Sequence, residues 1–109
     1  MNNLNEITTL DFFKFYQKNS NFRIIDVRDP NEYDNYHIHG SINIPCNLLI
    51  EKHNLFIKKD FVYFIICQNG TRSKTATFAL NKLGYNVTNV INGIDKWPGL
   101  LISSKRYKF

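Results

Sequence analysis

The chain has 109 residues, 43% of them apolar and 15% aromatic, which fits one globular domain spanning residues 1–109. No apolar run approaches the roughly 18 residues that a membrane-spanning helix needs, and the N-terminal residues show no secretory signal, so we expect a cytoplasmic protein without a membrane partner. The net charge is +5, but three basic residues lie in a C-terminal tail, residues 102–109, and the rest lacks the basic stripe of a nucleic-acid-binding face, so we expect no nucleic-acid partner.

In chain order, the first predicted element is a helix within residues 7–19. Thr8 and Asp11 have the spacing of a helix capping signal, and apolar residues recur after them at helical intervals. Residues 22–27 then indicate a strand. The turn-rich segment that follows contains Pro30, which has no backbone N–H for a strand ladder, and we expect one helical turn there.

The remaining segments predict a short strand, a short helix, a wholly apolar strand, an amphipathic helix and a last strand. They lie at residues 41–45, 47–52, 61–67, 72–84 and 86–91. The apolar strand has no polar face, which is typical of a central parallel strand covered by helices on both sides. This alternation predicts a three-layer α/β domain around a mostly parallel sheet.

Cys67 ends the apolar strand and stands just before the amphipathic helix. Ligands bind beyond the carboxyl ends of parallel strands, and a helix N-terminus offers unpaired N–H groups that attract anions. Gly70 allows the intervening backbone to turn several N–H groups inward, and Arg72 adds a positive charge. These features indicate that Cys67 is a nucleophile and that the N–H groups hold an anionic sulfur on it. The alternative, a cysteine that only fills the core, is less favoured.

Three blocks of the sequence resemble the rhodanese-like sulfurtransferase family. The segment CQNGTRS, residues 67–73, resembles the active-site loop of that family. DVRDPNEYDNYHIHGSINIP, residues 26–45, and LNKLGYNVTNVINGIDKW, residues 80–97, resemble its two other signatures. One departure is Asn92, which stands where the family usually has the first of two glycines; asparagine tolerates left-handed backbone angles, so we expect little effect.

The resemblance implies one parallel five-stranded sheet flanked by helices and a two-step sulfur transfer without a cofactor. The Cys67 thiolate would take a sulfane sulfur from a donor such as thiosulfate. The persulfide would pass it to a thiophilic acceptor, such as cyanide in an assay, or a thiol or partner protein in the cell. Backbone N–H groups of the loop would hold the terminal sulfur, and Arg72 would complement the charge of the donor. The implied substrate-binding residues are Gln68, Asn69, Gly70, Thr71, Arg72 and Ser73.

Two other functions stay open from the sequence. One is a cysteine-dependent phosphatase or arsenate reductase-like enzyme, because related folds use loops with five residues between the cysteine and an arginine. Only four residues separate Cys67 from Arg72. The other is a non-catalytic interaction module, a role that rhodanese-like domains often have when the cysteine is absent. The sequence does not indicate the oligomeric state.

Other reactive side chains have simpler structural explanations. Asp26, Arg28 and Glu32 look like a catalytic charge cluster, but in the family pattern we expect them to form pairs that brace the site. Cys46 is expected to be a small packing residue, with a resolving-thiol role as the alternative if the fold brings it near Cys67.

The two histidines of the segment HIHG do not predict a metal site. His37 and His39 alternate on a strand-like stretch and so face opposite sides, and no third ligand is suggested. We expect His37 to hydrogen-bond to the backbone of its own turn, and we expect no metal.

Overall fold

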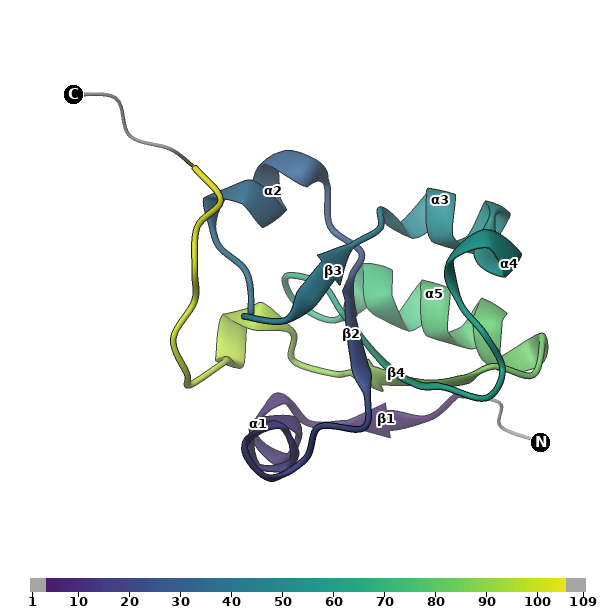
Figure 1. Cartoon of the computed structure of the whole chain (residues 1–109), viewed down its shortest axis with the longest axis horizontal. Helices are drawn as coiled ribbons and strands as arrows, with labels where there is room; N and C mark the ends of the chain where they lie inside the picture. Colours follow the sequence, from purple (N-terminus) through teal and green to yellow (C-terminus); the bar gives the residue numbers. More distant parts are fainter. Residues whose placement is uncertain (1–3, 106–109) are drawn as a thin grey trace.

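The computed structural model describes residues 4–105. Five strands form one sheet, and they are β1 (Glu6–Ile7), β2 (Arg23–Asp26), β3 (Ser41–Asn43), β4 (Val62–Ile66) and β5 (Asn86–Val90). Their order across the sheet is β1-β5-β4-β2-β3, and each neighbouring pair is parallel (Figure 1). The predicted parallel five-stranded sheet is therefore confirmed.

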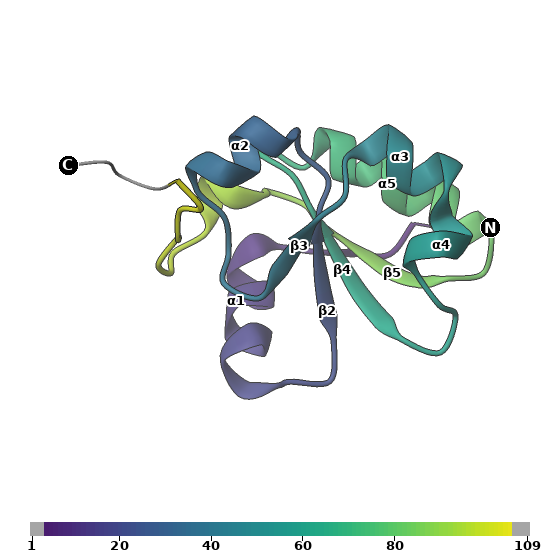
Figure 2. The same ribbon diagram turned by 45° about the horizontal axis from the view of Figure 1, so that its top comes forward.

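Helices cover both faces of this sheet, which confirms the predicted three layers. They are α1 (Thr9–Lys18), α2 (Pro30–Asn35), α3 (Cys46–Glu51), α4 (His53–Phe56), α5 (Thr71–Lys82) and the short 3-10 helix η1 (Ile94–Lys96). Figure 2 shows α1 on one side of the sheet and α3, α4 and α5 on the other.

The first helix begins where its capping signal predicts. The Thr8 side chain accepts a hydrogen bond of 3.1 Å from the backbone N–H of Asp11, which has no partner within the helix. Phe12 of α1 is fully buried, and its ring centroid lies 4.6 Å from that of Phe64 in β4. Aromatic packing of this kind adds about 0.5–1.5 kcal/mol beyond area burial, so it holds α1 on the sheet.

The central strand β4 is apolar throughout because each of its faces packs into a separate core cluster. Phe64 and Ile66 belong to the cluster that contains Phe12 of α1. Ile65 belongs to the other cluster, which contains Leu80 of α5. The expectation from the unbroken apolar run is confirmed.

The carboxyl ends of β2 and β4 bring three chain segments together at one edge. The backbone N–H of Val27 donates to the carbonyl of Ile66 at 2.9 Å, and that of Cys46 donates to the carbonyl of Val27 at 3.1 Å. Cys67 follows β4 at this edge and α5 begins at Thr71, so the loop of interest lies where the strand ends and the helix starts.

Two short elements were not expected from the sequence. β1 has only two residues and pairs with β5 through Glu6 and Ile7, which is too short to produce an alternating pattern. α4 is a single turn at residues 53–56, which is likewise too short to carry a periodic signal.

The segment after the last helix returns to α2. Ile102 forms an antiparallel bridge with His37, and the backbone N–H of Ser104 donates to the carbonyl of Asp34 at 3.0 Å. Part of the predicted tail, residues 102–105, thus contacts the rest of the chain, and residues 106–109 lie outside the described residues. No helix within residues 4–105 is long and apolar enough to cross a bilayer.

Candidate active site

The sulfur of Cys67 receives hydrogen bonds from the loop that follows it. The backbone N–H groups of Gly70 and Ser73 donate to Cys67 Sγ at 3.1 and 3.3 Å, and Ser73 Oγ lies 3.2 Å away. Cys67 is fully buried at the N-terminal end of α5. Converging N–H donors and a helix N-terminus stabilise negative charge on a sulfur at this position.

Gly70 makes this geometry possible in two ways. Its φ is +96°, in the left-handed region, and a Cβ placed on it would lie 1.7 Å from the carbonyl oxygen of Ile91. Any other residue would therefore be both strained and in collision with fixed backbone. The inward turn of the loop depends on glycine, as the sequence predicted.

The loop is also hydrogen-bonded to the start of η1, just after the turn that follows β5. The carbonyls of Cys67 and Gln68 accept hydrogen bonds from the backbone N–H groups of Ile94, at 2.9 Å, and Asp95, at 3.0 Å. A Cβ on Gly93 would lie 2.5 Å from both of these carbonyl oxygens. This second glycine lets the turn approach the loop closely.

Asn92, the departure from the family pattern, does not need the left-handed tolerance that we invoked for it. Among residues 4–105, positive φ values occur only at glycines, and Gly93 is the one in this turn.

The side chain of Gln68 points toward a polar network and not toward the sulfur. Its Oε1 accepts hydrogen bonds from Arg28 Nη1 at 3.1 Å and from the Tyr36 hydroxyl at 3.3 Å. Its Nε2 donates to Asp95 Oδ1 at 2.6 Å. Gln68 therefore anchors the loop that carries Cys67.

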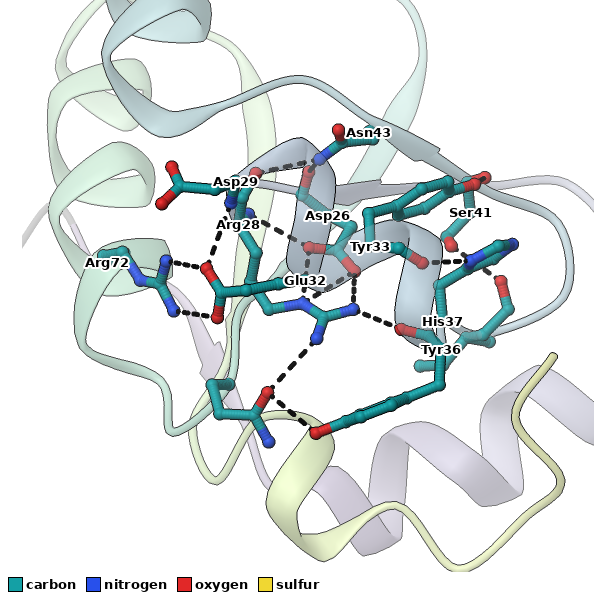
Figure 3. Close-up of polar contacts among 12 residues, drawn as sticks. Asp26, Arg28, Asp29, Glu32, Tyr33, Tyr36, His37, Ser41, Asn43 and Arg72 are labelled. Atoms are coloured by element: carbon teal, nitrogen blue, oxygen red, sulfur yellow. Dashed lines mark hydrogen bonds and ion pairs between the residues drawn. The ribbon is translucent and has the colours of Figure 1, made fainter. Parts of the chain in front are cut away.

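Asp26 and Arg28 form the buried ion pair behind this network (Figure 3). Arg28 Nη2 lies 2.8 Å from Asp26 Oδ2, Arg28 Nε also donates to the carboxylate, and Nη2 donates to the carbonyl of Tyr36 at 2.6 Å. Both charged side chains are almost completely buried. They form the structural pair expected from the sequence, and through Gln68 the pair braces the loop.

Arg72 is held by Glu32 in the same view (Figure 3). Its Nη1 and Nη2 donate to the two carboxylate oxygens of Glu32 at 2.6 and 3.0 Å. The hydrogen bond from Arg72 lowers the pKa of Glu32 to about 2, and the carboxylate in turn raises the pKa of Arg72. The third expected member of the bracing set, Glu32, thus pairs with the loop arginine.

The other two loop residues interact with each other. The backbone N–H of Thr71 donates to Asn69 Oδ1 at 3.1 Å, so this N–H is directed away from the sulfur. Among the backbone N–H groups of the loop, which we expected to hold the sulfur, those of Gly70 and Ser73 donate to Cys67 Sγ.

Cys46 and Cys67 lie on opposite sides of one peptide group. Cys46 Sγ donates to the carbonyl of Arg72 at 3.4 Å, while the N–H of the same peptide group, that of Ser73, donates to Cys67 Sγ. A disulfide requires sulfurs about 2.05 Å apart, so joining them would require the first turn of α5 to move. Burial raises the pKa of the Cys46 thiol, with a further contribution from Cys67.

Two clefts flank the loop. One, of about 310 Å³, is lined by Arg72 and Cys46 among others. The other, of about 360 Å³, is lined by Gln68, Tyr36 and Asp95 of η1 among others. Tyr36 and Asp95 were not identified as site residues from the sequence, since nothing in their spacing marks them as neighbours of the loop.

His37 behaves as expected from the sequence. Its Nδ1 donates to the carbonyl of Tyr33 at 2.7 Å, and the two rings stack with centroids 3.7 Å apart. Within residues 4–105, no three His, Cys, Asp or Glu side chains are grouped so that they could hold a metal ion.

The sequence and the fold are similar to those of known proteins. Residues 10–99 match the family model described as the rhodanese-like domain. The uncharacterized protein YqhL of Bacillus subtilis (strain 168) is 36% identical over 100 residues, which cover 91% of this chain and 76% of that protein. The putative sulfur carrier protein YrkF of the same strain is 34% identical over 101 residues, which cover 89% of this chain and 54% of YrkF.

A solved structure agrees with the sequence matches. The rhodanese-related protein from Thermoplasma volcanium has a TM-score of 0.80 and 32% identity, over 90% of this chain and 97% of that one. The matched residues include the whole loop from Cys67 to Ser73. They also include the segments 26–45 and 80–97, which contain the residues that hold this loop. The chain therefore belongs to the rhodanese-like domain family.

Proposed function

We propose that the protein is a sulfurtransferase that carries a sulfane sulfur on Cys67. The observation that carries the proposal is the pair of backbone N–H groups, of Gly70 and Ser73, aimed at Cys67 Sγ at the N-terminus of α5. Membership of the rhodanese-like family and similarity to a protein named as a sulfur carrier support sulfur transfer in general.

The reaction proceeds in two displacements. The Cys67 thiolate attacks the outer sulfur of a donor such as thiosulfate; a new S–S bond forms, the S–S bond of thiosulfate breaks, and sulfite leaves with the electron pair. An acceptor then attacks the terminal sulfur of the persulfide, and the thiolate of Cys67 is regenerated. Cyanide serves as the acceptor in an assay and leaves as thiocyanate, whereas in the cell we propose a thiol or a partner protein.

The chain contributes positioning and charge stabilisation. The N–H groups of Gly70 and Ser73 hold the anionic sulfur, and preorganised donors of this kind avoid the cost of reorganising water during the reaction. Asn69, Thr71 and Gln68 keep the loop in shape through the contacts described above. We propose that the donor approaches by the cleft that Arg72 lines, where the guanidinium meets its negative charge.

A phosphatase is less well supported by this loop. A phosphoryl group needs three equatorial oxygens to be held at once, whereas two N–H groups here converge on the Cys67 sulfur. Four residues separate Cys67 from Arg72, one fewer than in the related phosphatases. We expect no Cys67-dependent hydrolysis of an aryl phosphate, and such hydrolysis would favour the phosphatase instead.

The proposal is tested by locating the transferred sulfur. The protein is incubated with thiosulfate, freed of excess reagent and digested with trypsin under non-reducing conditions. Lys52 and Lys59 lie between the two cysteines, so these fall in different peptides. We expect the mass of one sulfur atom on the Cys67 peptide, and its loss on addition of cyanide.

Two variants complete the test. Cys67→Ala should neither acquire sulfur nor transfer it to cyanide. Cys46→Ala, which removes the other thiol, should still acquire sulfur and transfer it. If Cys67→Ala still transfers sulfur from thiosulfate to cyanide, the proposal is wrong. If Cys46→Ala folds but loses turnover, Cys46 takes part as a relay, contrary to the packing role that we assign to it.

A further inference from the structure

The guanidinium of Arg72 is already occupied by a carboxylate of the same chain. Its Nη1 donates to Oε1 of Glu32 and its Nη2 donates to Oε2, in the paired geometry that a guanidinium also uses for other oxyanions. The two side chains are 38% and 34% exposed, so a solute can reach the pair. A sulfonate group that arrives at Arg72 must therefore displace Glu32 or share the guanidinium with it.

Glu32 is fixed in this position by a second contact. Its Oε1 also accepts the backbone N–H of Asp29 at 3.2 Å, which completes a capping box at the start of α2. Because the pKa of Glu32 is lowered to about 2, the side chain keeps its negative charge under every usual assay condition. Arg72 thus faces a negative charge throughout the pH range of such assays.

We propose that Glu32 determines donor specificity by competing with oxyanionic donors for Arg72. The inference rests on the proposed sulfur transfer. A donor that carries sulfonate oxygens, such as thiosulfate, loses affinity because of the carboxylate. A donor without such oxygens, such as an alkyl persulfide, does not need Arg72; Cys67 attacks its terminal sulfur, the S–S bond of the donor breaks, and the alkyl thiolate leaves. The site therefore favours persulfide sulfur over thiosulfate sulfur.

The test compares Glu32→Gln with Asp34→Asn. Glutamine has nearly the same shape and can still accept the N–H of Asp29, but it has no charge. Asp34 lies two residues further along α2 and forms no ion pair with any of residues 4–105, so its substitution controls for the change in net charge. Steady-state rates are measured with thiosulfate and with an alkyl persulfide at constant ionic strength.

For Glu32→Gln we expect the KM for thiosulfate to fall roughly three- to tenfold. The substitution removes a partly exposed ion pair that competes for Arg72, and it removes the repulsion between the carboxylate and the thiosulfate dianion. The kcat, and both constants with the persulfide, should stay within about twofold, and Asp34→Asn should match the wild type. Glu32→Asp, which keeps the charge on a shorter side chain, should give a smaller fall. An unchanged or raised KM for thiosulfate, or equal changes with both donors, would overturn the inference.

Binding of inorganic sulfate separates this inference from the proposed function, because sulfate cannot donate sulfur. Its affinity is followed through the NMR signals of the Arg72 side chain and the loop amides, with chloride balancing ionic strength. Tighter binding to Glu32→Gln is the expected result, and equal affinity would overturn the competition at Arg72 while leaving sulfur transfer intact. Tighter sulfate binding in a protein that never forms a persulfide would instead overturn the proposed function alone.

Discussion

Replacing Gly70 by alanine should impair both folding and sulfur transfer, and the structure gives the size of each effect. The new Cβ would lie 1.7 Å from the carbonyl oxygen of Ile91, where 3.4 Å is the lower end of ordinary contact. Neither atom belongs to a flexible side chain, so the two backbones would have to separate by more than about 1 Å in a close-packed interior. The separation would turn the N–H of residue 70 away from Cys67 Sγ.

The two contributions to stability can be estimated separately. A left-handed backbone conformation costs a non-glycine residue about 1–2 kcal/mol. Overpacking adds about 1–3 kcal/mol, so we expect Gly70→Ala to lower the free energy of unfolding by roughly 2–5 kcal/mol. Loss of one of two preorganised donors to a reacting anion should lower kcat on the order of a hundredfold.

Gly40 provides the matched control. Its φ is +89°, close to that of Gly70, but a Cβ there would have no atom within 4 Å. Gly40→Ala should therefore show the backbone strain alone, about 1–2 kcal/mol, with turnover near that of the wild type. Urea unfolding gives the stabilities and thiosulfate:cyanide turnover gives the activities. If Gly70→Ala matches Gly40→Ala in both measurements, the close approach of the loop to Ile91 does not determine the site.

Two more predictions concern the ion pairs. Arg28→Met should lower the free energy of unfolding by about 3–5 kcal/mol, because it leaves the buried carboxylate of Asp26 unpaired; a loss below about 1 kcal/mol in urea unfolding would contradict this. The pKa of Glu32 is about 2 in the folded protein against an ordinary 4.5, so its pairing stabilises the fold above about pH 4.5 and is lost as the pH falls toward 2. With solvent screening of this half-exposed pair, the stability difference between wild type and Glu32→Gln should be about 1 kcal/mol at pH 6 and should shrink at pH 3, a trend that urea unfolding at the two pH values checks.

The features that the sequence predicted correctly depend on local pattern. The apolar run 61–67 identified the central strand because burial on both faces leaves no polar alternation. Thr8 and Asp11 identified the start of α1 because a capping bond spans only three residues. The inward turn at Gly70 was predicted for the same reason, since left-handed angles are a property of one residue.

The features that were missed depend on contacts between distant segments. The pairing of Arg72 with Glu32 was not predicted because Glu32 lies 40 positions earlier, and nothing in a linear spacing tells an arginine which carboxylate it will meet. The same limit applies to Gly93, whose importance appears only when the turn after β5 lies against the carbonyls of Cys67 and Gln68. β1 was missed because two residues carry no periodicity.

The pairing of both arginines determines which groups would hold an anionic sulfur under the proposed function. Arg28 is neutralised by Asp26 and Arg72 by Glu32, so neither contributes an uncompensated positive charge next to Cys67. The stabilisation must then come mainly from the N–H groups of the loop and the N-terminus of α5, whose dipoles are fixed by the backbone and need no side-chain ordering. Such dipoles act over a short range and suit one terminal sulfur at contact distance. A long-range positive field would instead attract any anion in solution, so under the proposed function we expect the loop to select its sulfur by contacts with its own backbone.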